Sequence, residues 1–188
     1  MGEAALRRIT VDEFLRWDSG DDLRYELVGG EIAAVTPPAN AHPIIVSNAK
    51  DAIKAKLKPL YCAYGEVGIT LSDRNDIYRQ AAAAVICSPI PPREHGVTKP
   101  VIIVEVVSSS TMAHAKAMKL ANDSHIPSVQ AIPFIANEEK RAELWRRGAD
   151  LWTVVELEPG GVIPLDAIGF DIPVEALYEG LDFTQGAA

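Results

Sequence analysis

The fold of this chain is decided by one stretch, Val101-Ile102-Ile103-Val104-Glu105-Val106-Val107, its strongest β-strand pattern. Because nearly every residue in it is apolar, the stretch predicts a central strand that is covered on both faces. A serine-rich turn follows and leads into a predicted helix over residues 112–123, with Pro127 after its end. Together with the elements on either side, this order predicts a mixed α/β domain in which helices pack on one sheet.

The rest of the chain supplies further helices and strands. Thr10 and Glu13 have the spacing of a capping box, which predicts a short helix that ends near residue 17. A second helix, over about residues 42–58, carries apolar residues every fourth position. Strands are predicted at residues 25–28, 31–35, 67–71, 77–87, 129–135, 142–146, 152–157 and 162–165, followed by a short helix over 173–178. We expect Pro133 to interrupt the strand predicted at residues 129–135, because proline donates no ladder hydrogen bond.

Length and composition narrow the class of protein. The chain has 188 residues, 48% of them hydrophobic and 23% charged, which predicts one globular domain and excludes a disordered chain. The longest uncharged apolar run, Ala81–Cys87, is far shorter than the roughly 20 residues of a membrane span. No signal peptide is recognisable, and Cys62 and Cys87 offer no disulfide framework. We therefore expect a soluble cytoplasmic protein with no membrane partner.

The formal net charge of −8 bears on nucleic-acid binding. A protein that coats nucleic acid by bulk electrostatics normally presents a basic face. The acidic balance argues against that class of protein. It leaves room for an enzyme that meets DNA in one local groove.

Glu105 is the first candidate functional residue. A carboxylate in an apolar strand is costly unless it is paired, neutral or bound to a metal, so an exposed edge position and a salt bridge to a helix lysine stay open beside a functional role. Lys119 lies two turns into the following helix, and its side chain can reach back toward the strand. A lysine there could stabilise a phosphate in its transition state. Lys119 could equally be solvated or pair with Asp123, four residues on.

Several short segments then occur in a recognisable order. Residues 24–32 read Arg-Tyr-Glu-Leu-Val-Gly-Gly-Glu-Ile, and residues 103–108 read Ile-Val-Glu-Val-Val-Ser. Lys119-Leu120-Ala121 and Arg141-Ala142-Glu143-Leu144-Trp145-Arg146 follow. Over about residues 10–178, this order and spacing resembles the bacterial putative restriction endonuclease family of the PD-(D/E)XK nuclease superfamily.

The resemblance implies a single α/β domain with the restriction-endonuclease-like fold, a mixed β-sheet flanked by helices. It implies a magnesium-dependent endonuclease that hydrolyses phosphodiester bonds in DNA. Matched residue by residue, Glu26, Glu105 and Lys119 take catalytic positions, and Glu105 also takes that of a metal ligand. The expected boundaries are residues 10–178 for the nuclease-type domain and residues 1–9 and 179–188 for terminal extensions.

One departure from the family pattern bears on activity. Ala82, within a run of four alanines, stands where the family pattern has a metal-binding aspartate. Magnesium usually takes one or two protein carboxylates, so we expect weakened metal binding. Asp73 and Asp76 could substitute for the aspartate, although their context favours a turn. Two readings remain open: an endonuclease that is impaired or inactive, and a noncatalytic binding or assembly module that retains the fold. A homodimer is also left open.

Overall fold

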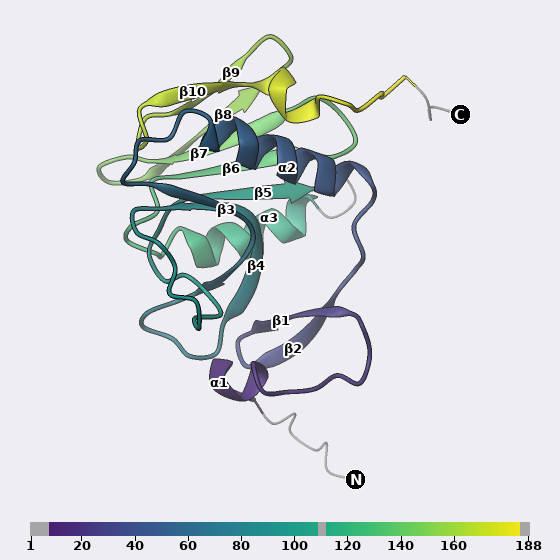
Figure 1. Ribbon diagram of the computed structural model, residues 1–188, viewed down its shortest axis with the longest axis vertical. Helices are drawn as coiled ribbons and strands as arrows, with labels where there is room; N and C mark the ends of the chain where they lie inside the picture. The colour runs from purple at the N-terminus through teal and green to yellow at the C-terminus, as the bar shows by residue number, and fades with distance from the viewer. Residues whose placement is uncertain (1–7, 109–111, 185–188) are drawn as a thin grey trace. The chain divides into compact units, whose positions relative to one another are not determined.

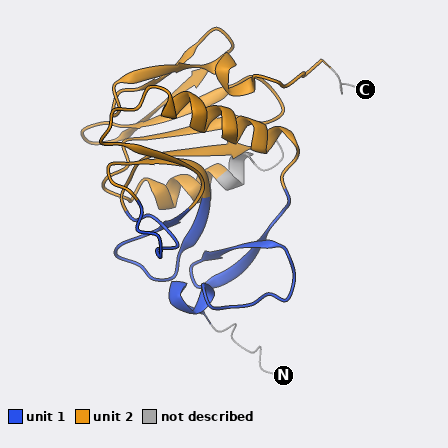
Figure 2. Cartoon of the chain, in the orientation of Figure 1, with its two compact units in different colours: residues 1–37, 68–80, 90–98 blue, residues 38–67, 81–89, 99–188 orange. Residues whose placement is uncertain are grey.

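The computed structural model describes residues 8–108 and 112–184, and the side chains of helix α3 (Met112–Asp123) from Lys116 onward. The serine-rich turn expected after Val107 lies outside these residues from position 109 to 111. The chain forms two compact units (Figure 2). Unit 1 comprises residues 1–37, 68–80 and 90–98, and unit 2 comprises residues 38–67, 81–89 and 99–188.

Unit 1 contains a β-hairpin. Strands β1 (Arg24–Val28) and β2 (Glu31–Val35) pair in antiparallel register. Both residues of the connecting turn, 29–30, are glycines with positive φ angles of 61° and 82°. A two-residue hairpin turn of this kind requires such angles, and glycine adopts them without strain. Helix α1 (Val11–Phe14) begins with the predicted capping box between Thr10 and Glu13.

Unit 2 contains the larger sheet. Its strand order is β4, β5, β6, β7, β8, with β3 beside β4 (Figure 1). From β4 to β8 the neighbouring strands are antiparallel except β5 and β6, which are parallel and joined through α3. A parallel pair needs such a crossover because both strands run in the same direction. The bounds are β3 (Cys62–Thr70) and β4 (Tyr78–Ile86), which both extend into unit 1, β5 (Pro100–Val107), β6 (Ala131–Ala136), β7 (Ala142–Arg147) and β8 (Trp152–Leu157).

Helices α2 (Ala41–Lys54) and α3 cover opposite faces of this sheet. Val104 and Leu144 belong to the apolar core that contains α2, whereas their neighbours Glu105 and Glu143 meet lysines of α3. Successive side chains of a strand point to opposite faces, so neighbouring residues of one strand meet different helices.

No helix in the described part of the chain is both long and apolar enough to cross a membrane. The predicted stripe of α2 is almost fully buried at Ile45, Ala49 and Ile53.

Element ends differ from the sequence prediction in several places. The first helix ends at Phe14 and the second at Lys54, earlier than predicted. Neither end is marked by a C-terminal glycine, so the sequence does not indicate the last helical residue. Strand β10 (Phe170–Pro173), which pairs with β9 (Val162–Leu165), was not predicted. The final short helix, η1 (Val174–Tyr178), is a 3₁₀-helix.

The expectation for Pro133 is wrong. Strand β6 runs without a break from Ala131 to Ala136, and Pro133 pairs in register with Leu144 of β7. The ladder with β5 is formed on either side of it, at Ala131 and at Phe134. Proline removes only its own N–H donor, so the flanking hydrogen bonds are sufficient to maintain the strand.

Tyr178 holds the turn between β6 and β7. Its hydroxyl lies 2.9 Å from the carbonyl oxygen of Ala136 and 2.6 Å from that of Arg141, and it accepts the N–H of Arg141 at 3.1 Å. The side chain is 2% exposed. Tyr178 therefore joins η1 to the turn that precedes β7.

Burial raises the pKa of Tyr178 to about 12 from its ordinary value of 10.0. Between these values the unfolded chain loses the tyrosine proton and the folded chain keeps it, so stability falls as pH rises. We expect the free energy of unfolding to drop by about 2 kcal/mol between pH 9.5 and pH 11.5 on account of Tyr178. Urea denaturation at pH 9.5 and 11.5 measures the drop. In Tyr178→Phe the drop should be smaller by that amount, and an equal drop in both proteins would contradict the assignment.

Candidate active site

Glu105 lies in the middle of β5 with its side chain 1% exposed. It forms an ion pair with Lys119 of α3, whose side chain is 22% exposed. A buried carboxylate requires such compensation. The sequence left open an exposed position, a salt bridge to a helix lysine and a functional role for Glu105. The structure shows the salt bridge, in which Lys119 of α3 pairs with Glu105 of the sheet.

Ala82 lies on the strand next to Glu105. Strands β4 and β5 pair at Ala83↔Val104 and Ala84↔Ile103. The paired register begins at Ala83, so Ala82 lies just beyond it. Its side chain is 5% exposed and belongs to the apolar core that contains α2. The position expected to carry an aspartate thus holds a buried methyl group on the strand beside that of Glu105.

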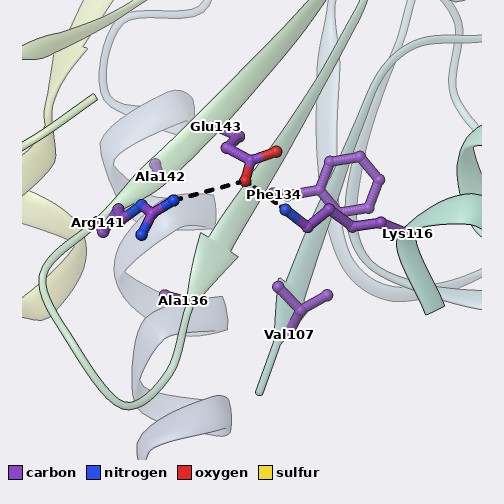
Figure 3. A pocket seen from close by; sticks show the side chains of 7 residues that line it. All are labelled: Val107, Lys116, Phe134, Ala136, Arg141, Ala142 and Glu143. Carbon is purple, nitrogen blue, oxygen red and sulfur yellow. Dashed lines mark hydrogen bonds and ion pairs between the residues drawn. The ribbon is translucent and has the colours of Figure 1, made fainter. Parts of the chain in front are cut away.

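A second ion pair, which the sequence analysis missed, lies on the same face. Lys116 of α3 pairs with Glu143 of β7, and Arg141 approaches Glu143 with its Nη2 4.0 Å from the carboxylate (Figure 3). Trp145 donates from Nε1 to Glu143 at 3.4 Å. Lys116, Arg141 and Glu143 line a small pocket together with Val107, Phe134, Ala136 and Ala142. The available signal was the spacing of Lys116 and Lys119, which places both on one side of a helix.

Glu26 belongs to unit 1. Its side chain is half-buried on β1, and its Oε1 accepts the backbone N–H of Gln80 at 2.9 Å. This hydrogen bond joins β1 to the start of β4, which also pair at Leu27↔Tyr78. Within unit 1, Glu26 therefore has a structural partner in the neighbouring strand.

Asp76, one of the two residues considered as a substitute ligand, is also in unit 1 and engaged in a turn. Arg74 donates from Nε and Nη2 to its two carboxylate oxygens, each at 2.8 Å. These hydrogen bonds hold the pKa of Asp76 below its usual value. Asp76 therefore serves as a turn residue, as its sequence context favours.

Magnesium binding at Glu105 depends on the oxygen donors around it. Magnesium takes oxygen ligands in near-octahedral geometry, with one or two protein carboxylates. Here Glu105 is neutralised by Lys119, and Ala82 offers no oxygen from its side chain. Among the described residues, no three His, Cys, Asp or Glu side chains gather into a metal-binding group. The residues present do not fit a resident magnesium ion.

Comparisons with known proteins identify a family, a relative and a solved structure that are similar to this chain. The sequence profile of the Uma2 family, described as "Putative restriction endonuclease", matches residues 11–175. An uncharacterized protein of Synechocystis sp. (strain ATCC 27184 / PCC 6803 / Kazusa) is 22% identical over 191 residues, with 96% of each chain covered. The crystal structure of a protein from Anabaena variabilis ATCC 29413, described as a putative nuclease belonging to DUF820, matches with a TM-score of 0.70. It is 21% identical, covering 94% of this chain and 98% of that one, so the two share a fold.

Proposed function

Because the chain belongs to the Uma2 family of putative restriction endonucleases, we propose that it has a DNA-cleaving site of the PD-(D/E)XK type, centred on Glu105 and Lys119. We propose further that this site is impaired by Ala82. The supporting observation is the buried methyl group of Ala82 on the strand beside Glu105, one residue beyond the pair Ala83↔Val104. Cleavage of DNA by the unmodified chain is then close to the background rate.

In this proposal each retained side chain has a limited role. The Lys119 ammonium stabilises negative charge that develops on a phosphate, as a preorganised cation does in a site that excludes water. Glu105 holds Lys119 in place through their ion pair. Glu26, in unit 1, matches the supporting carboxylate of the family pattern, and no contact with Glu105 or Lys119 is assigned to it. Since the donors present do not fit magnesium, no step of the reaction in this chain is assigned to a metal.

A noncatalytic module that binds DNA or assembles with a partner is the second candidate. It is favoured by the ion pair between Glu105 and Lys119, in which each charge already has a partner. It is also favoured by the alanine run, in which all four side chains are buried in β4. With a net charge of −8, DNA contacts in either case have to be local, because the bulk field of the protein repels phosphate. Activity of a repaired site discriminates between the two candidates.

Magnesium binding tests the proposal without an activity assay. Calorimetry with millimolar magnesium should detect little binding by the unmodified chain, and Ala82→Asp should bind more tightly because it adds a hard oxygen donor beside Glu105. Ala82→Asn is the matched control, since it adds nearly the same volume without the charge. Circular dichroism checks that both variants fold. Tight binding by the unmodified chain would show that the proposed defect is wrong.

A further inference from the structure

Helix α3 is attached to the sheet by two ion pairs. Lys116 and Lys119 are three residues apart and so lie on one side of the helix. Their partners lie in one row across the sheet, because Glu105 is opposite Phe134 and Phe134 is opposite Glu143. Residues in such a row share a face. The two lysines therefore reach the same face of the sheet on either side of Phe134.

The pair between Lys116 and Glu143 is largely buried, like the pair between Lys119 and Glu105. The side chains of Lys116 and Glu143 are only 16% and 13% exposed. Lys116 and Arg141 approach the Glu143 carboxylate from different directions (Figure 3), and Trp145 donates to it as well. Glu143 thus has partners from β7 and from the turn before it as well as from α3.

Two attachments constrain a helix differently from one. A lysine has a flexible four-carbon stem, so a single pair between Lys119 and Glu105 permits more rotation of α3 about its axis than two pairs do. Arg147 holds the end of α3 near Ser124 and Ile126, and the second pair, one helical turn away and on a different strand, restricts rotation at Lys116. The orientation of the Lys119 ammonium then depends on Glu143 as well as on Glu105.

We infer that Lys116 and Glu143 are positioning residues that set the Lys119 ammonium in its working orientation. This inference rests on the proposed role of Lys119 at the cleavage site. Neither residue touches the reacting atoms in this account. Both act through the rotation of α3.

The test observes Lys119 directly. In ¹⁵N–¹H NMR spectra of lysine ammonium groups, a buried ion-paired lysine gives a resolved signal, which Lys119→Arg would assign. Glu143→Gln should shift or broaden the Lys119 signal, although Glu143 does not contact Lys119. Lys116→Met should do the same, whereas Lys116→Arg, which keeps the pair, should restore it. Glu156→Gln is the matched control, since Glu156 also pairs with Arg141, at 3.5 Å, but is 64% exposed.

An unchanged Lys119 signal in Glu143→Gln and Lys116→Met would overturn the inference. Kinetics give a second readout in the Ala82→Asp background. There, Glu143→Gln should lower kcat by roughly 10- to 100-fold with little change in KM, as expected for a misplaced catalytic group. An unchanged kcat would also overturn it. No cleavage at all by Ala82→Asp would contradict the proposed function instead, and the NMR comparison would still decide whether Glu143 positions Lys119.

Discussion

Replacing Ala82 with aspartate is expected to raise the rate of DNA cleavage in magnesium by a factor of about 10² to 10³, since one well-placed electrostatic contact contributes that much. The new carboxylate would lie on the strand that pairs with β5, one residue beyond the pair Ala83↔Val104. Two carboxylates on adjacent strands supply the hard oxygen donors that magnesium prefers. The measurement is single-turnover cleavage of plasmid and linear duplex DNA by the unmodified chain and by Ala82→Asp.

Ala82→Asn separates charge from volume in this experiment. It should remain at the background rate because a neutral amide is a poorer magnesium ligand than a carboxylate. Manganese, which also accepts oxygen ligands, should support the activity of Ala82→Asp. Vigorous cleavage by the unmodified chain would contradict the account. Absence of cleavage by both proteins on every DNA tested would favour the noncatalytic module.

Replacing Lys119 with methionine is expected to lower the free energy of unfolding by about 3–5 kcal/mol. The change removes the ammonium that neutralises Glu105, whose side chain is 1% exposed. Urea denaturation measures the loss, and an unchanged m-value confirms that the same surface is exposed on unfolding. Lys54→Met, at the exposed end of α2, is the matched control and should change stability by less than about 0.5 kcal/mol.

A second variant makes this result specific to the pair. When Glu105→Gln is combined with Lys119→Met, both charges are removed, and the loss should be clearly smaller than in Lys119→Met alone. If Lys119→Met cost no more than Lys54→Met, the pair would not be the buried interaction described above.

The fold could be predicted because its central elements have strong local patterns. The apolar run of β5 and the four-residue repeat of α2 each predict their element from neighbouring residues alone, and both are present. The resemblance to the restriction endonuclease family is confirmed by the profile match to residues 11–175 and by the shared fold of the Anabaena protein. The ends of the helices and the effect of Pro133 were predicted less well. At Pro133, the pairing of β6 with β5 on either side of the proline maintains the strand.

The candidate site could be predicted only in part. Glu105 was conspicuous because a charge in an apolar strand demands an explanation, and its pairing with Lys119 was one of those considered. The pairing of Lys116 with Glu143 joins residues 27 positions apart, and nothing local in the sequence indicates which strand carries the partner.

Two further side chains illustrate the same limit. Asn48 of α2 donates to the carbonyl oxygens of Leu177 at 3.0 Å and Glu179 at 2.9 Å, which anchors the end of η1. Arg147 of β7 donates to the carbonyl oxygens of Ser124 and Ile126, each at 2.8 Å, at the end of α3. Both contacts depend on the tertiary arrangement of unit 2, so the sequence alone shows only two ordinary polar residues.

The most direct test of the site is the cleavage rate of the double variant Ala82→Asp/Glu105→Ala compared with that of Ala82→Asp. If the restored carboxylate acts together with Glu105, the double variant should return to the background rate of the unmodified chain while remaining folded by circular dichroism. A double variant that cleaves DNA as fast as Ala82→Asp would contradict the placement of the active site at Glu105.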